Sequence, residues 1–104
     1  MTIETQTALD GTSVAIRLSG DLDLYAAPRL RTTVVEILVE GAERIDIDMA
    51  GISYLDSSGV GAIVSLIMAA RRRGAAISFK GIAGHARIVL ERTHLMPLIG
   101  EAVA

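Results

Sequence analysis

Residues 45–61 read IDIDMAGISYLDSSGVG, and two different periodicities meet within this stretch. Over 45–49, apolar residues alternate with acidic ones, which predicts a strand with one buried and one charged face. Residues 50–56 are expected to form a loop that leads directly into a helix from Ser57 to Arg73. The buried stripe of that helix is expected to contain Val60, Ile63, Val64, Ile67 and Met68.

The first residues of the chain predict a β-hairpin. Apolar residues alternate with polar ones over 3–9 and again over 14–18. Between these runs stands Asp10-Gly11, a dipeptide typical of a two-residue hairpin turn. We expect Gly20 to end the second strand of this hairpin.

A helix is predicted after the hairpin. It should begin between Asp23 and Ala27, because Pro28 is tolerated only in the first turn, and it should stop near Gly41. Its buried stripe is expected to contain Ala27, Leu30, Val34, Ile37 and Leu38.

The residues beyond 73 predict the rest of a mixed sheet. Gly74 is well placed to cap the helix before it, residues 76–80 predict a strand and residues 84–93 a helix, and Leu98-Ile99 suggest a short last strand. The element order predicts an α/β fold with a mixed sheet of four to five strands. In this fold an N-terminal hairpin precedes alternating helices and parallel strands, and the helices lie mainly on one face. The charged face of 45–49 predicts that the other side of the sheet is open to solvent.

Composition excludes several classes of protein. The 104 residues carry a net charge of −2 and are expected to form one domain, 1–104. The absence of Cys excludes disulfides, a thiol nucleophile and zinc thiolate sites. Only Tyr25, Tyr54 and Phe79 are aromatic, which together with the mild acidity argues against nucleic-acid binding. No apolar run reaches the length of a membrane span and no secretion signal is recognised, so we expect a cytoplasmic protein without membrane insertion.

No residue pattern predicts catalysis, a cofactor or a metal. Nucleotide-binding glycine motifs are absent, and Leu55 occupies the position where a nucleophile elbow before Ser57 would need glycine. The alternating Asp46 and Asp48 are interpreted as a solvated strand face. The two histidines, His85 and His94, are interpreted as ordinary surface or edge residues. We therefore predict that the chain is not an enzyme.

The junction at 56–61 has local chemistry of its own. Asp56 is expected to accept hydrogen bonds from free N–H groups of the first helical turn, which contains Ser57 and Ser58. Gly59 and Gly61 are expected to keep side chains off the surface around it. An Asp-Ser-Ser-Gly run is also an ordinary helix start, so these residues alone do not establish a function.

The chain resembles the STAS domain family, and most closely its small stand-alone members, the bacterial anti-sigma factor antagonists. The likeness rests above all on residues 54–61, with support from Gly20-Asp21-Leu22-Asp23 and from the strand 45–49 with Asp48, and it runs from Ile3 to Ile99. It implies a STAS-like mixed sheet. Family members usually continue into a further C-terminal helix, whereas this chain is expected to stop shortly after its last strand.

The resemblance also implies roles for individual residues. Ser57 would be the phosphoacceptor, Ser58 a second candidate and Asp56 the neighbouring carboxylate. Asp23 would be the loop acid near the serine. The partner-binding switch loop would comprise Asp21, Asp23, Asp56, Ser58, Gly59 and Gly61.

The implied function is partner switching in the control of transcription. The unphosphorylated protein would bind an anti-sigma factor that has serine kinase activity, and phosphorylation of Ser57 would release it. A phosphatase would restore the binding state, and the protein is expected to be a monomer. The alternative is a STAS accessory or scaffold subunit of a larger assembly, such as a lipid-transporting ABC system or a signalling complex, because one fold serves both roles.

Overall fold

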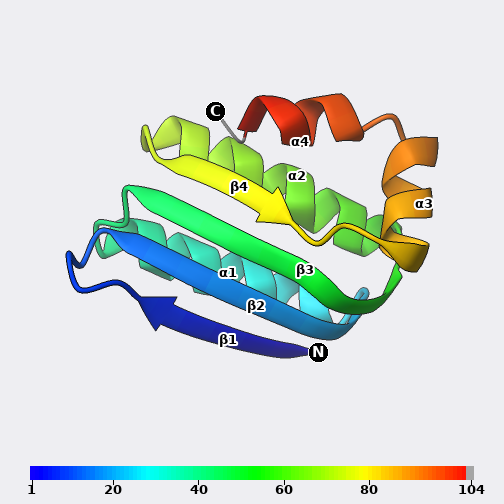
Figure 1. Cartoon of the computed structure of the whole chain (residues 1–104), viewed down its shortest axis with the longest axis horizontal. Coiled ribbons are helices and arrows are strands. Elements are labelled where there is room, and N and C mark those ends of the chain that lie inside the picture. The colour runs from blue at the N-terminus through cyan, green and yellow to red at the C-terminus, as the bar shows by residue number, and fades with distance from the viewer. Residues whose placement is uncertain (103–104) are drawn as a thin grey trace.

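A single four-stranded sheet organises the chain in the computed structural model, which describes residues 1–102 (Figure 1). The sheet order is β1-β2-β3-β4; β1 and β2 are antiparallel, and β2, β3 and β4 are mutually parallel. The strands are β1 Thr2–Thr7, β2 Ser13–Leu22, β3 Arg44–Leu55 and β4 Ala76–Lys80. The predicted mixed sheet with an N-terminal hairpin is therefore confirmed.

Two helices cover one face of this sheet. In Figure 1, α1 and α2 lie side by side behind the strands, α3 stands near the end of β3, and α4 lies along β4. The helices are α1 Ala26–Val39, α2 Ser57–Arg72, α3 Gly84–Arg92 and α4 Met96–Ala102. The placement of the helices mainly on one face agrees with the prediction. Within residues 1–102, every helix is too short or too polar to span a bilayer.

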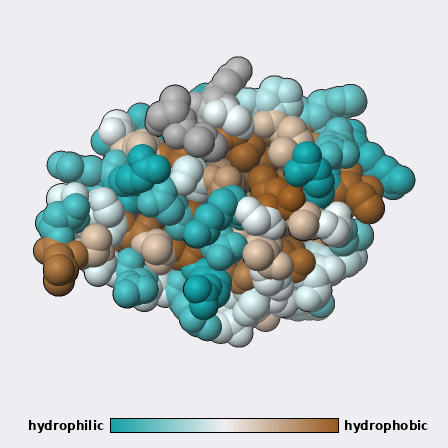
Figure 2. All heavy atoms as spheres, in the orientation of Figure 1, coloured by the Kyte–Doolittle hydropathy of each residue, from teal (hydrophilic) through white to brown (hydrophobic). Residues whose placement is uncertain are grey.

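The two faces of the sheet have opposite chemistry. Inward-facing residues of β2 and β3, such as Ile16 and Ile47, are buried against the helices. Hydrophilic side chains are spread over the open face, which Figure 2 presents. On this face Asp46 accepts a hydrogen bond from the Ser78 hydroxyl at 2.5 Å and pairs with Arg44 at 3.1 Å. Partial burial raises the pKa of Asp46, but the Ser78 hydrogen bond and the Arg44 charge outweigh it, so the pKa lies below its usual value.

The hairpin connection is longer than predicted. It spans residues 8–12 instead of two residues. The Asp10 carboxylate accepts hydrogen bonds from the main-chain N–H groups of Thr12 at 2.8 Å and Ser13 at 3.2 Å. These bonds lower the pKa of Asp10 and stabilise a wider turn than the Asp-Gly pair indicates.

Both central strands also run further than predicted. β2 continues past Gly20 to Leu22, and β3 continues through residues 50–55, where a loop was expected. The ladder between them shifts register twice in this region. A Cβ on Gly51 would lie 2.7 Å from the main-chain oxygen of Leu18, so glycine permits the close approach. Pairing between distant segments, and not local alternation, extends the strands.

The buried stripe of α2 is rotated from the predicted one. Ile63 and Ile67 are buried as expected, but Val60 and Val64 are only half-buried and Met68 is 43% exposed. The buried residues are Gly59, Ala62, Ile63, Leu66, Ile67 and Ala70. Small residues on this side let the helix lie close to the sheet, and a search for large apolar residues overlooks them.

The predicted last strand at Leu98-Ile99 is wrong. These residues lie in α4, where Ile99 is buried. His94 has a φ of 59°, which separates α3 from α4, and Pro97 lies in the first turn of α4. A further helix therefore follows α3, contrary to the expectation that the chain stops without one. A short apolar pair does not by itself distinguish a strand from a helix.

Candidate functional site

The first turn of α2 lies at the carboxyl ends of β2 and β3. Leu22 and Leu55 pair at the last position of the two strands, and the Asp56 N–H donates to the Leu22 oxygen at 3.4 Å. The chain leaves both parallel strands at the same edge of the sheet. The loop before α1 therefore lies next to residues 56–61, which we call the head of α2.

Asp56 is the N-cap of α2, as predicted. Its backbone is extended, and its Oδ1 accepts a hydrogen bond from the Gly59 N–H at 3.0 Å. Its main-chain oxygen accepts the first helical bond from Val60 at 3.0 Å. The helix consequently begins at Ser57, which is exposed, whereas Ser58 is half-buried. Of the two candidate serines, Ser57 offers the more accessible hydroxyl to another protein.

The two glycines of the head have different surroundings. Gly59 is buried, and an added Cβ would overlap the Leu22 oxygen and lie 2.5 Å from Leu55 Cδ1. Gly59 therefore permits close packing of α2 on the strands, and the expectation that it clears the surface is wrong. Gly61 is half-buried, and the nearest side-chain atom to a Cβ there is Arg31 Nη2 at 3.6 Å.

The predicted loop acids lie at this same end of the sheet. The Asp23 carboxylate accepts hydrogen bonds from the N–H groups of Tyr25 and Ala26, both at 3.0 Å, so it helps to start α1. Asp21 is exposed and stands opposite Tyr54 in the β2–β3 ladder. Together with Asp56, these residues place three carboxyl groups near the start of α2.

His85 contributes to this region in a way the sequence did not indicate. Its Nδ1 accepts a hydrogen bond from the Leu55 N–H at 3.0 Å. Its ring stacks on Tyr54, with centroids 4.9 Å apart and an interplanar angle of 14°. His85 is exposed, as expected, but it is not an ordinary surface residue, since it holds the strand end just before Asp56. The contact joins residues thirty positions apart, and no spacing in the sequence signals it.

Exposed apolar side chains occur on the segments that meet at this end of the sheet. Leu24 and Tyr25 precede α1 and are 62% and 83% exposed. Tyr54 at the end of β3 and Ile88 on α3 are also exposed. Apolar groups gathered at one end of a domain are typical of a protein-binding surface.

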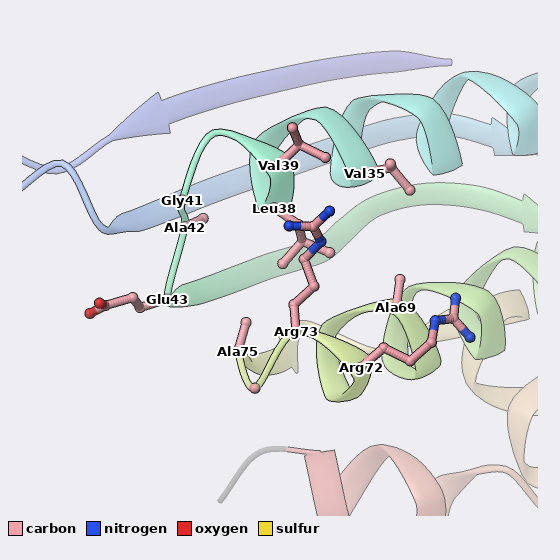
Figure 3. Close-up of a pocket in the computed structure, with 11 residues that line it drawn as sticks. Val35, Leu38, Val39, Gly41, Ala42, Glu43, Ala69, Arg72, Arg73 and Ala75 are labelled. Atoms are coloured by element: carbon pink, nitrogen blue, oxygen red, sulfur yellow. The ribbon is translucent and has the colours of Figure 1, made fainter.

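Other parts of the molecule offer less to a functional site. A cavity of about 760 Å³ lies between the C-terminal halves of α1 and α2, lined by Val35, Val39, Ala69, Arg72 and their neighbours (Figure 3). It is at the opposite end of α2 from Ser57. Within the described part of the chain, no three His, Asp or Glu residues are grouped so as to hold a metal ion.

Comparison with known proteins places the chain in a family. The family model described as "Mlab, STAS domain" matches residues 5–100. The anti-sigma-B factor antagonist of Bacillus subtilis (strain 168) is 24% identical over 99 residues, 95% of this chain and 90% of that protein. A putative anti-sigma factor antagonist from Thermotoga maritima has 18% identity and a TM-score of 0.82, over 93% of this chain and 82% of its own. The Bacillus cell fate determinant SpoIIAA, solved in its phosphorylated form, has 22% identity and a TM-score of 0.72, over 92% and 86%. With a shared fold and a family match over nearly its whole length, the chain belongs to the STAS domain family.

Proposed function

We propose that this chain is an anti-sigma factor antagonist that binds an anti-sigma factor while Ser57 has a free hydroxyl. The observation that carries the proposal is the exposed Ser57 in the first turn of α2, directly after the Asp56 cap. Exposed apolar side chains lie on other segments at the same end of the sheet. Relatives over the full length of the domain are named anti-sigma-B factor antagonists. SpoIIAA, which has this fold, has been solved both unphosphorylated and phosphorylated, and this supports the proposal that the present chain is phosphorylated.

In this proposal the anti-sigma factor is also the serine kinase. The Ser57 oxygen forms a bond to the γ-phosphorus of ATP as the bond between that phosphorus and ADP breaks, and a base of the kinase accepts the hydroxyl proton. ATP is bound by the partner, so the chain is a substrate and not an enzyme. A phosphatase later hydrolyses the ester and restores the binding state.

The phosphate would disrupt binding mainly through its charge. It adds about −1.5 to −2 at neutral pH. Asp56 directly follows β3, Asp21 lies near the end of the neighbouring strand β2, and Asp23 lies in the loop after β2. Desolvating this concentrated negative charge at an interface would cost about 2–5 kcal/mol of binding free energy, which is enough to release a partner.

Binding and modification test the proposal separately. The purified protein is incubated with ATP and the candidate kinases of its own genome, and mass spectrometry locates the phosphate, which is expected on Ser57. Calorimetry then measures affinity for the kinase that modifies it. Ser57→Asp should weaken binding by about a hundredfold or more, and Ser57→Ala should not. Thr32→Asp, which adds the same charge at an exposed position of α1, is the matched control. Equal affinity of Ser57→Asp and the unmodified protein would overturn the switch.

A second candidate is an accessory STAS subunit of a larger assembly, such as a lipid-transporting ABC system. The observation that favours it is the matching family model, whose description names Mlab and not an antagonist. Copurification distinguishes the two. A stable complex with a permease and its ATPase would favour the accessory subunit, whereas a complex with a kinase-like anti-sigma factor would favour the antagonist.

A further inference from the structure

Arg31 on α1 has a buried hydrogen-bond donor without an acceptor. Its side chain is only partly exposed, and its Nε is buried with no hydrogen-bond partner. Arg44 pairs with Asp46 and Arg87 pairs with Glu91, and Arg31 takes part in neither ion pair. A buried charged donor that lacks an acceptor is uncommon in folded proteins. The position is therefore suited to an anion that the free chain lacks.

One nitrogen of the Arg31 guanidinium lies beside Gly61, in the second turn of α2. This nitrogen, Nη2, is 3.6 Å from the position that a Cβ would take on Gly61. Gly61 follows Ser57 by four residues and Ser58 by three, and such residues share a helix face with Cβ positions about 5–6 Å apart. Because Gly61 has no side chain, it does not itself separate Arg31 from this face of the helix.

Two of the three nearby carboxylates, those of Asp56 and Asp23, already accept hydrogen bonds from main-chain N–H groups. Asp56 accepts from the Gly59 N–H, and Asp23 accepts from two N–H groups at the start of α1. Neither forms an ion pair with Arg31 in the described residues. An arginine fork is well suited to phosphate, because two parallel N–H groups match two phosphate oxygens.

We propose that Arg31 is the counter-charge that binds the phosphate ester on Ser57, which rests on the proposed phosphorylation of that serine. The phosphate oxygens accept hydrogen bonds from the guanidinium N–H groups, and the modified side chain then bridges α2 and α1. Arg31 is a positioning residue in this role. Arg31 holds the phosphate against the domain, where the phosphate opposes the binding of a partner. The carboxyl groups of Asp56 and Asp23 keep the hydrogen bonds from their own N–H donors.

The test installs the phosphate without any kinase or partner. Phosphoserine is incorporated at position 57 during translation, and ³¹P NMR follows its second ionisation with pH. A nearby cation favours the dianion and lowers the pKa of the phosphate. Arg31→Gln should therefore raise that pKa by about 0.5 or more. Arg31→Lys, which retains the charge without the fork, should raise it less. Arg29→Gln is the matched control, since Arg29 is also on α1 but bonds to the Met1 oxygen.

The outcomes separate this inference from the proposed function. An unchanged phosphate pKa in Arg31→Gln, or an equal rise in Arg29→Gln, would overturn it. A second protein with phosphoserine at 58 completes the test, because a rise seen only there would overturn the assignment to Ser57. If no kinase modified Ser57, the proposed function would fail while the titration result stood unchanged.

Discussion

The two ends of α2 satisfy the unpaired backbone groups of the helix in different ways. At the tail, residues 71–74, Arg71 and Arg72 occupy the last turn, where cations suit the helix dipole. Gly74 adopts a φ of 69°, and the Ala75 N–H returns to the Ala70 oxygen at 2.9 Å. These are ordinary means of ending a helix, and they account for the residues found there.

At the head, helix capping does not account for the residues present. The Asp56 side chain caps the first turn, yet an exposed serine follows it, and exposed apolar side chains lie on other segments at this end of the sheet. Arg31, whose Nη2 lies beside Gly61, has a buried Nε with no acceptor. Features that folding does not require are the ones that indicate function, so the comparison supports our proposal of a functional surface at the head.

The largest expected effect comes from Gly59. Gly59→Ala places a methyl group against the Leu22 oxygen and Leu55 Cδ1, and we expect it to lower the free energy of unfolding by about 2–3 kcal/mol. The control Gly61→Ala meets only ordinary contact and gains helix propensity, so its effect should stay within about 1 kcal/mol. Urea denaturation measures both. A Gly59→Ala protein as stable as Gly61→Ala would show that the head is not packed as described.

His85 should have the next largest effect. His85→Ala removes the acceptor of the Leu55 N–H and the ring stacked on Tyr54, which should lower stability by about 1–2 kcal/mol. Hydrogen exchange of the Leu55 amide should accelerate. His94→Asn is the control, because His94 is exposed at a left-handed position that asparagine tolerates. Unchanged exchange at Leu55 would contradict the contact.

Removing a capping residue should lower stability by a smaller amount than the changes above, and the loss should differ between the two ends of α2. Asp56→Ala removes the bond from Gly59 and should cost about 1 kcal/mol. Arg72→Ala at the tail removes a dipole interaction worth about 0.3–0.5 kcal/mol. Thermal unfolding of both variants measures the difference. Equal losses would remove the contrast between head and tail.

The smallest effect is expected away from both ends, at Asp46. Its pKa is lower in the folded state, so its contribution to stability is present above the unfolded pKa and is lost as pH falls through the folded pKa. Asp46→Asn should therefore be less stable than wild type at pH 7, and the difference should shrink in acid below the usual range of aspartate. Ser78→Ala, which removes the 2.5 Å hydrogen bond, should show a weakened form of the same pH dependence. A difference independent of pH would argue against this account.

The sequence alone determined the features that depend on near neighbours. Alternation over 45–49 predicted a strand with a solvated face, and Asp56 and Gly74 marked the two ends of α2. The run around Ser57 indicated the family that the comparison later showed. Helix caps and strand alternation act over a few residues, so a linear sequence contains them.

Only the tertiary structure decided the features that join distant residues. Pairing with β2 extends β3 to Leu55, and packing against the sheet selects which side of α2 is buried. The bond from Leu55 to His85 and the approach of Arg31 to Gly61 bring together residues thirty positions apart. Local periodicity contains no information about such contacts, because they form only once the strands and helices have packed. The sequence therefore located the serine, and the fold supplied the residues that surround it.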